Sequence, residues 1–252
     1  MSIIEQNRKF MHCPSFKEGM AQSDQSKEVS APPFHNAREG EAIVLPAFTG
    51  NFTTPSYADL LDIRRSLRNY ADKPMTQQEL AFMLWSAQGI QFTRAHSSLR
   101  PTPSGGARHP FETYIAVRSV EGLEAGLYHY VPQEDIGEKH ATIWKKSDAI
   151  APEKITEMLA GQKWAEKAPV VLFYTCVPYR AEWRYVNMAH RVMLIDLGHL
   201  GQNAMLSAAA LGMGSCCMAA FDQGACDSVL ALDGINEYTV YAIAVGTAEA
   251  AK

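Results

Sequence analysis

Cysteine is scarce in this chain, and its few thiols are not spaced for cross-linking or for metal binding. Five cysteines occur among 252 residues, an odd number, and no two of them form a Cys-x-x-Cys pair. So few thiols do not suggest a disulfide framework in a chain of this length, so we expect reduced cysteines in a cytoplasmic protein. Zinc needs ligands at regular spacing, which neither Cys216–Cys217 nor His190 and His199 provide. We therefore expect no metal.

Basic residues are not in excess, and long apolar runs are missing. Lys and Arg total 23 against 27 Asp and Glu, which gives a net charge of −4. This balance argues against a nucleic-acid partner but leaves room for a local pocket that holds one phosphate. No apolar run approaches the roughly 20 residues that span a bilayer. The segment Met1–Met20 is charged and lacks the apolar core of a secretory signal, so we expect no membrane association.

Two common enzyme signatures are also missing. The chain contains no Gly-x-Ser-x-Gly elbow, so a serine hydrolase has no support. Gly212-Met213-Gly214 lacks the third glycine of a dinucleotide fingerprint. It also follows a predicted helix and precedes a strand, the reverse of the order that directs a helix N-terminus at a pyrophosphate. We therefore reject a Rossmann-type site.

Helices and strands alternate along the chain, which indicates an α+β or α/β body around one sheet. Hydrophobic residues make up 47% of the chain, enough for a sizeable core. Ser56 and Thr76 each begin a capping box, which predicts helices at these positions, the second ending at Gly89. The apolar run Pro169–Cys176 predicts a central strand covered on both faces. Alternation and helix-start residues predict further strands at Phe111–Val117, Gly126–Val131, Ala141–Lys145 and Glu237–Val245, and short helices at Pro152–Leu159 and Asp222–Leu230.

The longest predicted element is an amphipathic helix over Glu182–Leu211, roughly 45 Å long at about 1.5 Å per residue. Small residues along it, including Gly198, Gly201 and Ala204, would let another helix approach closely. That favours a dimer interface, and a buried central helix within one subunit competes with it.

The N-terminal region differs from the rest of the chain. We place an arm at residues 1–54 and a single folded domain at 55–252, because the first part lacks a sustained period and is broken at Ala31-Pro32-Pro33. The arm either wraps the body or a partner subunit, or it is a partly disordered tail.

Three groups of residues could carry chemistry. Arg64 and Arg68 stand four apart, so we expect them on one helix face, where guanidinium groups can bind a phosphate; a solvated basic helix end is the alternative. The loop Pro103–Ala107 contains tandem glycines that could bring backbone N–H groups to a ligand, although an ordinary turn fits as well. Asp196, His199 and Asn203 share a helix face, either for acid–base work or, more simply, as polar partners at a helix interface.

In their order along the chain, these segments resemble the FMN-dependent nitroreductase superfamily. They most resemble its SagB-type branch, which includes azoline dehydrogenases that make thiazoles and oxazoles in peptides. The resemblance runs from Tyr57 to Gly246. Its landmarks are RRSLRNY (64–70), TQQELAFMLWSAQGI (76–90), PSGGARHPFE (103–112), GLYHY (126–130), DLGHLGQNAMLSAAALGMGSCCMAAFD (196–222) and AVG (244–246).

The resemblance implies an α+β three-layer sandwich with a central mixed sheet, a long interface helix and an intertwined homodimer that holds two FMN molecules. Arg64 would hold the phosphate or ribityl chain, and Arg68 would stabilise negative charge at the N1/C2=O edge of reduced flavin. The full set of implied cofactor-binding residues is Arg64, Arg65, Ser66, Arg68, Pro103, Ser104, Gly105, Met218, Ala219 and Ala220.

The chain departs from the family's patterns at several points. Ala107 and His109 stand where general nitroreductases often carry Asn and Gln, which favours the SagB-type branch. The azoline enzymes often have a Lys–Tyr pair at the start of the long helix, whereas this chain has Arg184–Tyr185. Arg stays protonated and is a poor base. Tyr185 could still remove a proton with Arg184 stabilising its phenolate, or it could simply pack at an interface.

Three functions are compatible with this resemblance. The first is hydride transfer between flavin N5 and a nitro compound, a quinone or a peptide azoline, with NADH or NADPH as candidate electron donor. The second is a non-catalytic partner in a peptide-modifying complex. The third is flavin-consuming chemistry.

Overall fold

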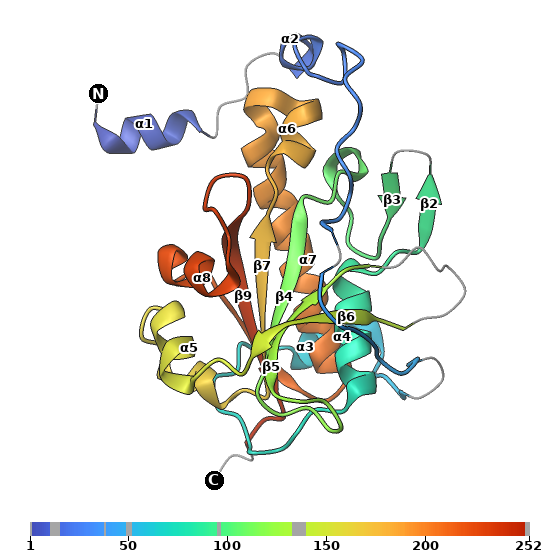
Figure 1. The fold of residues 1–252 in the computed structure, drawn as a ribbon, viewed down its shortest axis with the longest axis vertical. Helices are drawn as coiled ribbons and strands as arrows, with labels where there is room; N and C mark the ends of the chain where they lie inside the picture. The colour runs from blue at the N-terminus through green and yellow to red at the C-terminus, as the bar shows by residue number, and fades with distance from the viewer. Residues whose placement is uncertain are drawn as a thin grey trace.

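A seven-stranded sheet forms the centre of the computed structural model, which describes residues 2–10, 16–37, 39–48, 52–94, 97–132 and 140–249 (Figure 1). The strand order is β1-β6-β5-β4-β7-β9-β8, and every pairing between these strands is antiparallel. The expected mixed sheet is therefore corrected. The strands are β1 (Ala42–Val44), β4 (Phe111–Val117), β5 (Gly126–Tyr130), β6 (Thr142–Asp148), β7 (Val170–Cys176), β8 (Gly214–Met218) and β9 (Tyr238–Gly246); β2 (Phe92–Arg94) and β3 (Ser97–Leu99) form a separate hairpin.

Helices cover both faces of this sheet, which gives three layers. On one face, α4 (Gln77–Gln88) and α7 (Ala189–Ala210) pack against Ile115, Leu172 and Ile243. On the other, α5 (Pro152–Met158) and α8 (Gln223–Leu230) pack against Phe173 and Ala242. All residues of β7 are buried between these layers, which confirms the predicted doubly covered central strand.

Local signals placed several elements correctly. Ser56 and Thr76 both make complete capping boxes, with the N3 carboxylate returning to the N-cap backbone, at the starts of α3 (Tyr57–Ile63) and α4. Gly89 is the C-cap of α4, and the predicted strands near residues 126–131 and 141–145 are β5 and β6, which pair antiparallel.

The arginine motif does not lie on a helix. The α3 helix ends at Ile63, and Arg64 leaves it with ψ 121°. The following chain instead pairs with β8, where Leu67 N–H donates to Ser215 O at 2.9 Å and Ser66 forms a parallel bridge with Ser215. The expected shared helix face of Arg64 and Arg68 is thus wrong, because long-range backbone pairing replaced the next helical turn.

The predicted single helix over residues 182–211 is also corrected. It is divided into α6 (Tyr179–Tyr185), the 3₁₀ turn η3 (Val186–Met188) and α7, with the break at Val186, whose φ is +48°. A Cβ placed on Gly201 of α7 would lie 2.8 Å from the Tyr241 ring. This small residue therefore lets the helix approach the sheet of its own chain. Such an approach agrees with the alternative of a buried central helix within one subunit.

The N-terminal region is more integrated than expected. It contains α1 (Ile3–Lys9) and α2 (Phe16–Ala21), and β1 then joins the edge of the main sheet beside β6. Leu45 and Phe48 are buried in the core. Residues 42–48 of the predicted arm thus pack with the sheet of their own chain. Within the described ranges, no helix is long and apolar enough to cross a membrane.

Candidate functional site

Seven of the predicted site residues lie in two segments that meet at the edge of the sheet. Arg64–Arg68 runs parallel to β8, and the Met218–Ala220 segment continues from the end of that strand. Between α3 and the end of α7 lies a pocket of about 230 Å³. Its lining residues are Ile63, Arg64, Arg65, Leu67, Met205, Ala209, Gly212, Met213, Gly214, Ser215 and Ala248. We call the Arg64–Arg68 and Met218–Ala220 segments, with this pocket, the arginine pocket.

The three guanidinium groups have different surroundings. Arg64 is half-buried in the pocket wall, and Arg68 is exposed. Arg65 Nη1 donates to the carbonyl oxygens of Asp62 and Arg64, so it caps the end of α3. Arg64 and Arg68 are therefore the better placed to bind an external anion.

Arg68 and Ala220 approach the same neighbouring turn. The Arg68 guanidinium carbon lies 5.7 Å from the centroid of the Trp164 ring, a cation–π distance. Gln162 Nε2 donates to Ala220 O at 2.7 Å. Met218 is buried, whereas Ala219 and Ala220 are exposed. The turn that contains Gln162 and Trp164 thus links the exposed Arg68 cation to the small-residue segment at Ala220, an arrangement that suits a flat, negatively charged ligand.

The remaining predicted site residues lie at a second place. The loop that contains Pro103, Ser104 and Gly105 contacts α6 and α7, where Arg184 and Tyr185 are found. Ser104 Oγ donates to Asp196 Oδ2 at 2.7 Å, and Gly105 N–H donates to both Asp196 oxygens at 3.0 and 3.1 Å. We call Pro103–Gly106 with Arg184, Tyr185 and Asp196 the loop region.

The tandem glycines allow this loop to pack closely against the helices. A Cβ on Gly105 would lie 2.4 Å from Val192 Cγ1. Gly106 has φ +58°, and a Cβ there would lie 2.7 Å from the Tyr185 hydroxyl and 2.8 Å from Arg184. The need for glycine is therefore explained by protein packing as well as by left-handed backbone.

The Arg184–Tyr185 pair is covered by the N-terminal region. Tyr185 is buried, and its ring lies 6.1 Å from that of Phe16 in α2. Arg184 Nη1 donates to Gln25 Oε1 at 2.7 Å, and the Arg184 guanidinium carbon lies 5.6 Å from the Tyr185 ring centroid. The two side chains that the resemblance linked are thus in contact.

The two groups of predicted site residues are separated within one chain. Figure 1 shows α6, which carries Arg184 and Tyr185, near the upper end of the molecule, and α3, which leads into the arginine pocket, near the lower end.

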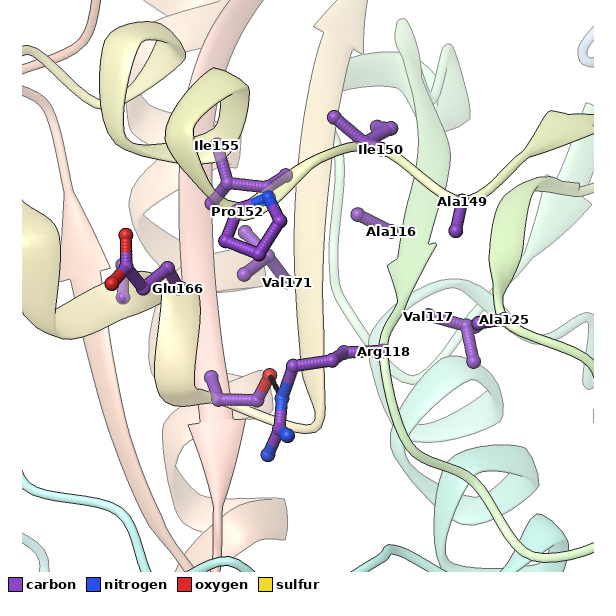
Figure 2. Close-up of a pocket in the computed structure, with 12 residues that line it drawn as sticks. Ala116, Val117, Arg118, Ala125, Ala149, Ile150, Pro152, Ile155, Glu166 and Val171 are labelled. Carbon is purple, nitrogen blue, oxygen red and sulfur yellow. Dashed lines mark hydrogen bonds between the residues drawn. The ribbon is translucent and has the colours of Figure 1, made fainter.

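A further cavity lies apart from both groups (Figure 2). Its volume is about 170 Å³, and Ala116, Ile150 and Val171 contribute to its apolar wall. Arg118 lies at its rim and donates to the carbonyl oxygens of Ala168 and Lys167. None of the predicted site residues lines this cavity.

The comparisons with known proteins identify the family. A family model described as the nitroreductase family matches residues 61–247. The chain belongs to this family. Membership supports a flavin-dependent oxidoreductase as the kind of protein, and it agrees with the exposed cations of the arginine pocket.

Individual relatives of this nitroreductase-family chain fall into two groups. A candidate nitroreductase of Methanocaldococcus jannaschii is 32% identical over 75% of this chain and 89% of its own length. The microcin B17-processing protein McbC of Escherichia coli is 31% identical over 45% of this chain and 42% of its own length. The E. coli microcin synthetase McbBCD complex contains a similar fold, with a TM-score of 0.60 and 20% identity over 99% of this chain and 98% of that one. The processing-protein relative agrees with the expected SagB-type branch.

Sequence reasoning missed the roles of two residues. Asp196 was interpreted as a partner of His199 on a helix face, whereas its carboxylate accepts from the Pro103–Gly106 loop. Trp164 carried no recognisable signal, because its contact with Arg68 joins segments nearly a hundred residues apart.

Proposed function

We propose that this chain is an FMN-dependent oxidoreductase that transfers a hydride between flavin N5 and an organic substrate. The observation that carries the proposal is the meeting of Arg64–Arg68 with the Met218–Ala220 segment beside a pocket, in a chain of the nitroreductase family. Bound FMN would supply two-electron chemistry, which side chains alone do not provide.

The residues of the arginine pocket would bind and tune the cofactor. Arg64 would hold the phosphate or ribityl chain, with Ser66 nearby, and Arg65 would contribute through its cap of α3. Arg68 would favour negative charge at the flavin N1/C2=O edge. The small residues Ala219 and Ala220 would let a planar ring lie close to the backbone.

The loop region would complete the site from a second subunit. In the proposed homodimer, Pro103, Ser104 and Gly105 of one chain reach the cofactor held by the other. The separation of the two regions within one chain supports this arrangement. Exposed apolar side chains on α3 and α7 offer surfaces for the partner, namely Leu61 and Ile63, and Leu194 and Ile195.

Arg184 and Tyr185 are the candidate catalytic pair. Tyr185 in its phenolate form would remove a proton from the substrate and become a neutral phenol, and the Arg184 cation would favour the phenolate form before that step. The contact between the two side chains supports this assignment. Tyr185→Phe keeps the ring but removes the hydroxyl, so it is expected to retain bound FMN while losing substrate turnover.

The class of substrate determines where the electrons come from. A nitro compound or quinone would draw electrons from NADH or NADPH through the flavin, whereas a peptide azoline would donate them. The relative named as a microcin-processing protein favours a peptide substrate. It also favours a second candidate function, in which this chain is a non-catalytic partner in a peptide-modifying complex.

The central experiment is a titration of the full-length protein with FMN, followed by flavin absorbance and fluorescence. We expect binding in the wild type, and Arg68→Ala should weaken it by about tenfold or more, since hydrogen bonds to charged groups are strong. Arg118→Ala is the control, because Arg118 lies at the separate cavity of Figure 2. Equal FMN affinity in the two variants would contradict the site assignment.

Reduction then separates the candidate functions. Bleaching of the bound flavin by NADH or NADPH supports the nitro-compound or quinone route. Bleaching by an azoline peptide alone supports a dehydrogenase. Failure of the wild type to take up FMN would overturn the enzymatic proposal and leave the partner function.

A further inference from the structure

The buried carboxylate of Asp196 gathers the hydrogen bonds of the loop that was predicted to reach the flavin. We propose that Asp196 is a positioning residue for this loop, and that Ser104 acts through Asp196 rather than as a direct ligand of the cofactor. The consequence for FMN rests on the proposed function, whereas the anchoring itself does not.

The hydrogen bonds fix the loop from both sides. The Ser104 hydroxyl donates its single proton to Asp196 Oδ2 at 2.7 Å and accepts from His109 N–H at 2.9 Å. Gly105 N–H is also directed at the Asp196 carboxylate. The Ser104 hydroxyl and the Gly105 N–H, which a ligand might use as donors, are therefore already engaged within the protein.

Burial makes this anchor strong. Asp196 is 5% exposed, and its partners are a hydroxyl and a backbone N–H, both donors that an ionised carboxylate binds well. Burial raises the pKa of Asp196, and the hydrogen bonds from Ser104 and Gly105 oppose that rise. A single side chain of α7 thus accepts hydrogen bonds from both the Ser104 hydroxyl and the Gly105 N–H.

Such an anchor would prepare the loop for a ligand before the ligand arrives. A loop that is already held in place pays less ordering entropy on binding, and a supporting residue of this kind keeps contacting atoms at a fixed position. Pro103 and Gly106, which are exposed on either side of Ser104 and Gly105, are then the parts of the loop that are presented outward.

The anchoring is tested first without any cofactor, by hydrogen–deuterium exchange of the full-length protein. In Asp196→Asn, the amides of Gly105 and His109 should exchange at least about tenfold faster than in the wild type. Asp227→Asn is the matched control, since Asp227 is similarly buried and accepts from Thr239 N and Oγ1, both at 2.7 Å. Unchanged exchange of both loop amides in Asp196→Asn would overturn the proposal.

The second test is a double-mutant cycle on FMN affinity. Asp196→Asn and Ser104→Ala should each weaken FMN binding by about tenfold, and the double variant should be no more than about threefold worse than either. Ser104→Thr retains the hydroxyl and should bind FMN as the wild type does. If the double variant instead lost about a hundredfold in FMN affinity, the product of the two single losses, Ser104 would contact the cofactor independently. That result would overturn this part of the proposal.

The two tests separate the proposals from one another. A wild-type protein that binds no FMN would remove the proposed function, yet faster exchange at Gly105 and His109 in Asp196→Asn would still support the anchor. Wild-type FMN binding that is unaffected by either substitution would leave the proposed function standing and overturn the positioning role.

Discussion

The arginine pocket and the loop region differ in how their polar groups are paired. Arg68 is exposed and Arg64 only half-buried, so these cations are available to an external anion. In the loop region, Ser104, Gly105 and Asp196 are bound to one another beneath the surface. Within one chain, the cations of the first region are at least partly exposed, whereas the polar groups of the second are paired with one another.

The two regions also differ in backbone strain, measured by positive φ angles at residues other than glycine. Ala107, His109 and Val186 have φ values of +53°, +44° and +48°, and all three lie in or beside the loop region. Within the described residues, no such value occurs in Arg64–Arg68 or in Met218–Ala220. Strained backbone persists only where surrounding contacts enforce it, and such positions often lie at functional sites.

The largest expected effect comes from a buried ion pair beneath the loop region. Glu112 accepts from Arg180 Nη2 and His129 Nε2, and both Glu112 and Arg180 are almost fully buried. Burial alone would raise the pKa of Glu112, but Arg180 and His129 outweigh it and lower the pKa to about 2. Glu112→Ala leaves a buried guanidinium without its carboxylate and should reduce the free energy of unfolding by about 3–5 kcal/mol, measured by chemical denaturation.

Two controls sharpen this prediction. Glu124→Ala breaks the pair with Lys145, in which Glu124 is 75% exposed, and should cost under about 1 kcal/mol. Arg68→Ala in the arginine pocket should change stability by no more than about 0.5 kcal/mol, since the Arg68 side chain is exposed. A loss in Arg68→Ala as large as that in Glu112→Ala would contradict the contrast between the two regions.

The next effect is a loss of stability in mild acid. Burial lowers the pKa of His109 to about 3, and Arg100 adds to this effect. Because the unfolded chain takes up this proton near pH 6.5 and the folded chain does not, stability falls as pH decreases from 6.5. By pH 5 the loss should be on the order of 2 kcal/mol.

Denaturation curves of His109→Gln at pH 6.5 and pH 5 test this assignment. Glutamine can still donate to Ser98 O, the partner of His109 Nε2. The variant should lose less stability than the wild type over this interval. His190→Gln, at a 50% exposed side chain, should keep the wild-type loss. An identical pH dependence in His109→Gln and the wild type would refute the explanation.

The smallest effect concerns strain in the loop itself. Ala107→Gly should raise the free energy of unfolding by about 0.5–1 kcal/mol, because glycine adopts positive φ without a Cβ penalty. Ala125→Gly, at a residue that is not among those with positive φ, should lower it. Thermal unfolding of both variants tests this prediction. A loss of stability in Ala107→Gly equal to that in Ala125→Gly would show that the backbone at Ala107 is not strained.

Much of the fold was determined by local sequence signals. The capping boxes at Ser56 and Thr76 act within four residues, and the apolar run of β7 reports burial on both faces directly. The candidate residues of the cofactor site, in contrast, came from ordered motifs that resemble a family. Their grouping into two separate regions had no local signal.

The sequence by itself therefore determined where helices start, which strand lies at the centre and which family the chain resembles, because those properties depend on neighbouring residues. Only the tertiary structure decided that Arg64–Arg68 leaves its helix to pair with β8, that the long helix breaks at Val186, and that Ser104 donates to Asp196. The pairing with β8 and the Ser104–Asp196 contact rest on hydrogen bonds between residues far apart in the chain. The break at Val186 lies within a helical spacing of apolar residues that continues on both sides of it. Side-chain periodicity cannot report such features.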